Sequence, residues 1–88
     1  MKQIPTTPQM VKSKVNYLEE ETKRLTNRNK ARYSERVRIF GNLSALWIST
    51  YTYLNEISQE LPREDYKKYL EKMMKTRDMM ADFAILGR

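Results

Sequence analysis

The 88-residue sequence contains no cysteine and no histidine. Without cysteine there is no disulfide framework, no thiolate nucleophile and no cysteine-based zinc site. Without histidine, the chain also lacks the commonest general base and the commonest metal ligand. Its two glycines, Gly41 and Gly87, are too few for a glycine-rich phosphate loop. We therefore expect a protein that is not an enzyme and that uses no cofactor or metal.

Proline and long apolar runs are also scarce. Three prolines, two glycines and 40% apolar residues are typical of a compact helical protein rather than a sheet protein or a disordered tail. The longest uncharged stretch, residues 39–55, includes Asn, Ser, Thr and Tyr, whereas a membrane span needs about twenty mostly apolar residues. Residues 1–8 do not resemble a secretory signal. A cytoplasmic protein without a transmembrane helix is the expectation, and the lack of cysteine fits it.

Positive charge is concentrated early in the chain. Seventeen Lys and Arg against eleven Asp and Glu give a net charge of +6. Residues 1–38 hold ten basic and four acidic side chains, whereas residues 39–88 hold seven of each. Within residues 23–38, seven cations accompany a single anion, Glu35. Most other cations follow an acid by four positions, a spacing that favours ion pairs on a helix; the expected pairs are Glu19–Lys23, Glu20–Arg24, Glu64–Lys68 and Glu71–Lys75.

The first helix is expected at about residues 8–26, after a tail of residues 1–7. Thr7 followed by Pro8 is an N-cap with proline in the first helical position, and Thr6 with Gln9 is a competing capping box. A narrow apolar seam follows; continued beyond residue 26, it would bury unpaired arginines, which is too costly. The helix therefore either breaks near residues 26–29 or leaves the core and runs on exposed, and we favour a short turn there. The seam consists of Val11, Val15, Leu18, Thr22 and Leu25.

The second and third helices are expected at about residues 31–59 and 62–86, with Asn29 or Ser34 capping the second. Pro62 stops the second helix and suits the first position of the third. Two apolar stripes make the second helix apolar over more than half its circumference, which predicts two neighbours and a central place. The stripes are Tyr33, Val37, Phe40, Trp47, Tyr51 and Leu54, and Ile39, Leu43, Leu46, Tyr53 and Ile57. The third helix has an apolar face of Tyr66, Tyr69, Leu70, Met73, Met80, Phe83 and Ala84.

These patterns predict an all-α fold in which residues 8–88 form a single helical domain. Its architecture is expected to be an up-down three-helix bundle with the second helix central. Such a bundle could complete its core by pairing with a second copy, as a homo-oligomer.

The main candidate site is a cationic ridge between Lys23 and Arg38. Arginines recur at every fourth residue, at positions 24, 28, 32 and 36, and these four side chains would form one ridge on a continuous helix. Guanidinium groups suit phosphate because their planar fork donates two hydrogen bonds at once. A ridge of this kind fits nucleic acid or an acidic protein surface. The alternative is a solvated basic face that binds no partner and only keeps the protein soluble. The candidate residues are Arg24, Arg28, Lys30, Arg32, Arg36 and Arg38.

A second candidate is a protein interface formed by Trp47, Tyr51, Met74 and Met79. Tryptophan and tyrosine often anchor interfaces, and methionine adapts to irregular partners. However, Trp47 and Tyr51 recur at core spacing, so burial within the bundle is the simpler interpretation for both. Met74 and Met79 fall on the two flanks of the third helix's apolar face.

Two functions follow from these sites. The first is a small, basic, non-enzymatic accessory protein that binds nucleic acid through the cationic ridge. The alternative is a modulator or inhibitor, of the kind that phages and other mobile elements often encode, that docks on an acidic, nucleic-acid-like groove of a larger protein.

Overall fold

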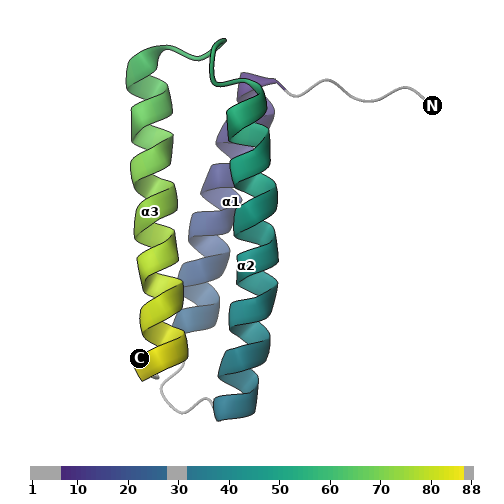
Figure 1. The fold of residues 1–88 in the computed structure, drawn as a ribbon, viewed down its shortest axis with the longest axis vertical. Coiled ribbons are helices and arrows are strands. Elements are labelled where there is room, and N and C mark those ends of the chain that lie inside the picture. The colour runs from purple at the N-terminus through teal and green to yellow at the C-terminus, as the bar shows by residue number, and fades with distance from the viewer. Residues whose placement is uncertain (1–6, 28–31, 87–88) are drawn as a thin grey trace, which may run out of the picture.

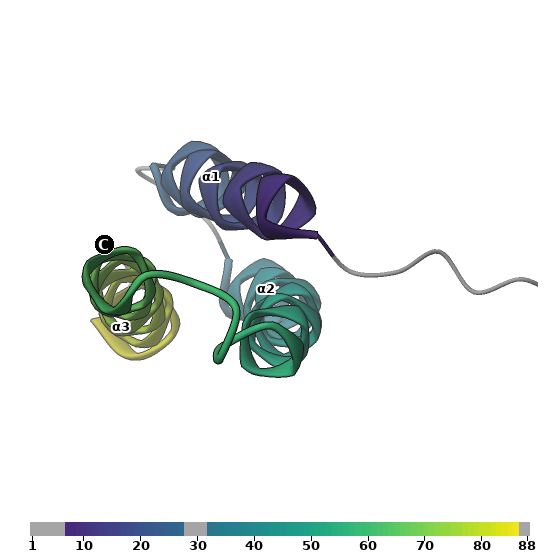
Figure 2. The same cartoon turned by 90° about the horizontal axis from the view of Figure 1, so that it is seen from above.

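The protein is an all-α bundle of three helices, α1 (Pro8–Thr26), α2 (Tyr33–Glu56) and α3 (Arg63–Leu86). The computed structural model describes residues 7–27 and 32–86. The helices run up and down in chain order (Figure 1), and each packs against both others. Seen from above, they stand at the corners of a triangle (Figure 2). The predicted up-down bundle is confirmed, and α2 has the two neighbours expected of it; because α1 and α3 also touch, α2 is not more central than they are.

The start and end of α1 agree with the sequence signals. The Thr7 hydroxyl accepts a hydrogen bond from the amide of Met10 at 3.2 Å, and Pro8 opens the helix. The competing capping box involves Thr6, which lies outside the described residues. At the other end the amide of Asn27 donates to the carbonyl of Lys23, which closes the helix after Thr26. The predicted interruption of the seam is therefore confirmed.

Helix α2 is shorter than the predicted 31–59. Arg32 is its N-cap residue and provides no side-chain cap, so the prediction that Ser34 caps the helix is wrong; Asn29 lies outside the described residues. The helix ends at Glu56 because Ile57 turns into the core and residues 57–60 form a turn. Ile57 is the C-cap residue of α2, and its amide donates to the carbonyl of Asn55.

Pro62 separates α2 from α3, as predicted, but it is not the first residue of the third helix. Its carbonyl accepts the first helical hydrogen bond, from the amide of Tyr66 at 3.0 Å. This places Pro62 at the cap position, one residue before its predicted place. Glu64 and Asp65 then lie in the first turn of α3, where carboxylates interact favourably with the helix dipole.

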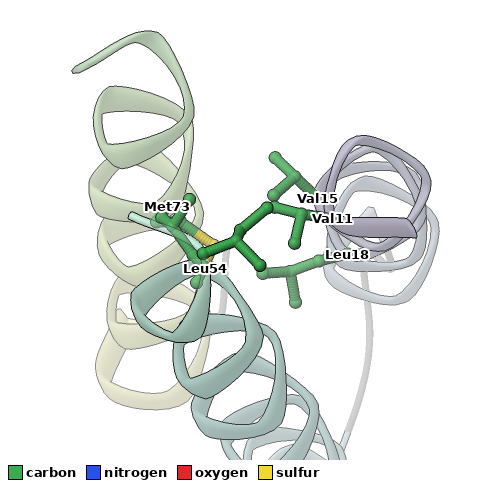
Figure 3. Close-up of a cluster of buried hydrophobic side chains, with 6 residues drawn as sticks. Val11, Val15, Leu18, Leu54 and Met73 are labelled. Carbon is green, nitrogen blue, oxygen red and sulfur yellow. The ribbon is translucent and has the colours of Figure 1, made fainter. Parts of the chain in front are cut away.

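The core consists of two apolar clusters. The first joins all three helices through Val11, Val15 and Leu18 of α1, Leu54 of α2 and Met73 of α3, whose side chains converge in Figure 3, together with Ile57. The second lies between α2 and α3 and contains Ile39, Leu43, Met80 and Phe83. Trp47 packs against both clusters. Most predicted core positions are thus confirmed.

Part of the first predicted stripe of α2 lies outside the core. Tyr33, Val37 and Phe40 are 70%, 51% and 37% exposed, whereas Ile39 and Leu43 of the second stripe are buried. A triangular bundle buries only the side of α2 that faces its two neighbours. The apolar arc of α2 is wider than that side, and the surplus forms an exposed apolar surface near the start of the helix.

The described residues include no helix that is both long enough and apolar enough to cross a membrane.

Candidate anion-binding surface

The start of α2 brings together arginines and backbone amides without a side-chain cap. The first amides of any helix have no intrahelical acceptor, and they form the positive end of the helix dipole. At α2 the N-cap residue is Arg32, which makes no side-chain cap hydrogen bond, and the first turn holds one acidic residue, Glu35. This end of the helix therefore combines three features that suit an anion: cationic side chains, amide donors and the dipole.

Arg32 and Arg38 are the exposed cations of this surface. Neither makes an ion pair within the described residues. Arg36 is half-buried, and its guanidinium lies 5.7 Å from the centre of the Tyr33 ring. Arg32 and Arg36 are four residues apart and share a side of α2, whereas Arg38 is two residues further and points to another side. The three arginines surround the first turns of α2 instead of forming one line.

The cations at the end of α1 are paired with acids of their own helix. Lys23 lies 3.7 Å from Glu19, as predicted. Arg24 binds Glu21 through two of its nitrogens, at 2.7 and 3.3 Å, so the predicted Glu20–Arg24 pair is wrong. This hydrogen bond, with the charge of Glu21, raises the pKa of the Arg24 guanidinium. Residues three apart also share a helix face, and there the carboxylate meets the fork of the arginine.

Two other predicted ion pairs do not form. Within the described part of the chain, Glu64–Lys68 and Glu71–Lys75 are not among the contacts shorter than 4.0 Å. Such exposed pairs gain little energy and lose side-chain freedom, so their absence is physically reasonable.

The predicted ridge is therefore only partly assembled. Because α1 ends at Thr26 and α2 begins at Tyr33, Arg24 and Arg36 belong to different helices. Arg24 is engaged by Glu21, while Arg32 and Arg38 remain exposed and unpaired within the described residues. Arg28 and Lys30 lie outside the described residues, and so their part of the prediction is untested.

Trp47 and Tyr51 belong mainly to the structure of the bundle. Both are half-buried and pack against the core. Their rings are stacked, with centroids 5.2 Å apart, and the Trp47 indole N–H donates to the Met73 carbonyl of α3 at 2.8 Å. The core interpretation of these two side chains is confirmed, because their contacts connect α2 to α3.

A hollow between α2 and α3 was not foreseen from the sequence. It has a volume of about 260 Å³ and is lined by Ser44, Trp47, Ile48, Arg77 and Met80. Ile48 is 62% exposed at its edge. The missed signal is the four-residue spacing Phe40–Ser44–Ile48, which extends the exposed apolar side of α2 toward this hollow.

The methionine candidates differ in how much of each side chain is exposed. Met74 is 45% exposed and Met79 is half-buried, whereas Met73 and Met80 lie in the core. Met74 borders a depression of about 530 Å³ on the outer side of α3. Its lining residues all belong to that one helix, and a single helix cannot enclose a cavity. We therefore regard this depression as open surface.

Residues 7–27 and 32–86 contain no group of three or more His, Cys, Asp or Glu side chains that could hold a metal ion. No known protein family, curated protein or solved structure matches this chain.

Proposed function

We propose that this protein is a small, non-enzymatic nucleic-acid-binding protein that contacts phosphates through the cations between Lys23 and Arg38. The observation that supports the proposal is the pair Arg32 and Arg38. Both are exposed and unpaired within the described residues, beside the first turn of α2, which has no side-chain cap. The surplus positive charge of the sequence falls in the same region.

Salt dependence gives the first test. If about five phosphates are neutralised on duplex DNA, log K falls with log salt at a slope near −4.5, a loss of roughly 500-fold between about 50 and 200 mM salt. The slope is measured by titrating labelled nucleic acid with the protein at several salt concentrations. A slope near zero contradicts phosphate contact.

A charge-reversal pair locates the surface. The Arg32→Glu/Arg38→Glu variant should bind more weakly, and its salt slope should become shallower by about 1.8, because two phosphate contacts are lost. The matched control is Lys67→Glu/Lys75→Glu on the outer side of α3, which changes the net charge by the same amount. Equal loss of binding in both variants would show that net charge alone, and not this surface, attracts nucleic acid.

The alternative is a modulator that docks on an acidic protein surface, and the exposed Ile48 beside the α2–α3 hollow favours it. In that case Trp47 and Ile48 supply the apolar anchor, while the arginines meet carboxylates. A pull-down from nuclease-treated lysate separates the two functions. A partner that wild-type protein retains, and that Ile48→Glu loses while the neighbouring control Thr52→Glu keeps, supports docking on a protein.

A further inference from the structure

An aromatic–arginine strip lies along the first two turns of α2. We define it as Tyr33, Arg36, Val37 and Phe40, which follow the spacing i, i+3, i+4, i+7 and therefore share one side of the helix. Its three apolar members are 70%, 51% and 37% exposed in chain order. The rings lie on the same helix end as the exposed cations Arg32 and Arg38, and contact with phosphates alone gives them no role.

Arginine and tyrosine lie close together within this strip. The Arg36 guanidinium lies 5.7 Å from the Tyr33 ring centroid, within the range of a cation–π contact. Most of the surface of Tyr33 remains exposed beside this contact. A flat ring next to a flat guanidinium is a suitable surface for the face of a nucleobase.

The strip fits single strands better than duplexes. In a duplex the base faces are hidden in the stack, so exposed aromatic rings gain nothing there. In a single strand the base faces are free, and each can stack on an aromatic side chain while cations hold the backbone. Tyr33 and Phe40 are separated by about 10 Å along the helix axis, from the rise per residue. This distance leaves room for two separate bases, with Arg32 close to the Tyr33 end.

We infer that the aromatic–arginine strip binds single-stranded nucleic acid by stacking bases on Tyr33 and Phe40. This inference rests on the proposed nucleic-acid-binding function and adds which form of nucleic acid is bound. The charge of Arg32, which is exposed and makes no ion pair within the described residues, lies beside Tyr33 and selects a polyanion as the occupant of this exposed side of α2. A protein partner that buries the strip is the competing outcome of the test.

Leucine substitutions separate stacking from apolar contact. Tyr33→Leu and Phe40→Leu keep an apolar side chain and good helix propensity but remove the ring. The matched control is Tyr17→Leu, a tyrosine of α1 that is 56% exposed and lies outside the strip. Helical content and unfolding temperature, measured by circular dichroism, establish that each variant is folded. Binding is measured by anisotropy for a labelled DNA strand, an RNA strand of the same sequence, and the DNA duplex.

Stacking predicts that single strands bind more tightly than the duplex. Each leucine substitution should then weaken single-strand binding on the order of tenfold, leave duplex binding unchanged, and exceed any effect of Tyr17→Leu.

Two results overturn the inference, and they differ in what they say of the proposed function. If both forms bind equally and the leucine variants behave as wild type, stacking is wrong while nucleic-acid binding stands. If neither strand nor duplex binds, the proposed function fails together with the inference, and a protein partner becomes the explanation of the strip.

Discussion

Four threonines are buried among residues 7–27 and 32–86, and only one of these four lacks a hydrogen bond for its hydroxyl. Thr26, Thr50 and Thr76 each donate to the carbonyl four residues earlier, at 2.6, 2.8 and 2.7 Å. The hydroxyl oxygen of Thr22, which is fully buried, has no partner among the described residues. A buried hydroxyl without a partner loses its hydrogen bonds to water and gains none in return.

Replacing Thr22 by valine should therefore stabilise the protein. Thr22→Val keeps the branched shape and removes the unpaired hydroxyl, and we expect the free energy of unfolding to rise by about 1 kcal/mol. Urea denaturation followed by circular dichroism measures the change. Thr76→Val is the matched control, because it removes a paired hydroxyl and should gain less. A loss of stability in Thr22→Val alone would show that its hydroxyl has a buried partner, such as water.

Contacts of single side chains were only partly predictable from the sequence. Helical spacing predicted that Arg24 would pair with an acid of its own helix, but not whether the acid lies three or four residues away, because both positions share its face. The structure selects Glu21, which holds two nitrogens of the guanidinium. The Trp47–Met73 hydrogen bond joins residues of two helices, and no local spacing could have indicated it.

At the scale of elements, local signals located α1 better than α2. Thr7 and Pro8 mark the start of α1 by their own chemistry, and the structure begins the helix there. The end of α2 at Glu56 depends on the reversal of the chain toward α3, which is a tertiary requirement. The apolar arc of α2 was visible in the sequence, but the part that faces α1 and α3 was not. For that reason the sequence pattern predicts burial for Tyr33, Val37 and Phe40, whereas the structure leaves them exposed.

Gly41 weakens α2 at an exposed position inside the helix. Glycine in a helix interior is about 0.8–1.0 kcal/mol less favourable than alanine. A Cβ atom added at Gly41 meets nothing within 4 Å, so Gly41→Ala encounters no steric obstacle. We expect this variant to raise the free energy of unfolding by about 1 kcal/mol, measured by thermal or chemical denaturation.

The reverse substitution one turn further along provides the control for Gly41. Ala45 is also exposed in the interior of α2, and Ala45→Gly should lower the free energy of unfolding by about the same amount. If Gly41→Ala stabilises the protein but weakens nucleic-acid binding, the missing side chain at Gly41 allows a ligand to approach the helix backbone closely. If it destabilises the protein while Ala45→Gly behaves as expected, α2 is not a regular helix at Gly41.

At the scale of the whole molecule, charge is distributed along the bundle. The α1–α2 end, where Arg32 and Arg38 begin α2, carries the unpaired cations. At the opposite end, the acids of the α2–α3 connection, Glu56, Glu60, Glu64 and Asp65, share the end of the bundle with Lys12 and Lys14 of the start of α1. The net charge of +6 therefore attracts a polyanion to the bundle as a whole, and the unpaired arginines distinguish the α1–α2 end.

The two core clusters make the stability of the whole bundle depend on single large side chains. Phe83 is fully buried in the cluster between α2 and α3, and Phe→Ala substitutions in cores cost about 3–5 kcal/mol. A protein of this size is expected to be stable by only about 4–13 kcal/mol. Phe83→Ala should therefore lower the unfolding temperature by at least about 12 °C.

The fluorescence of Trp47, the only tryptophan, reports whether the loss of stability in Phe83→Ala affects both core clusters together. Because its side chain packs against both clusters, tryptophan fluorescence and circular dichroism should follow one common unfolding transition, in wild-type protein and in Phe83→Ala alike. The control is Ile85→Ala, in the same turn of α3 but 78% exposed, which should change stability by less than about 0.5 kcal/mol. Separate transitions for the two signals would show that the clusters unfold independently. In that case the Val11–Met73 cluster, whose buried residues come from all three helices, would remain folded after the cluster around Phe83 has opened. The buried residues of the second cluster come from α2 and α3 alone, and α1 touches that cluster only through the partly buried Leu25.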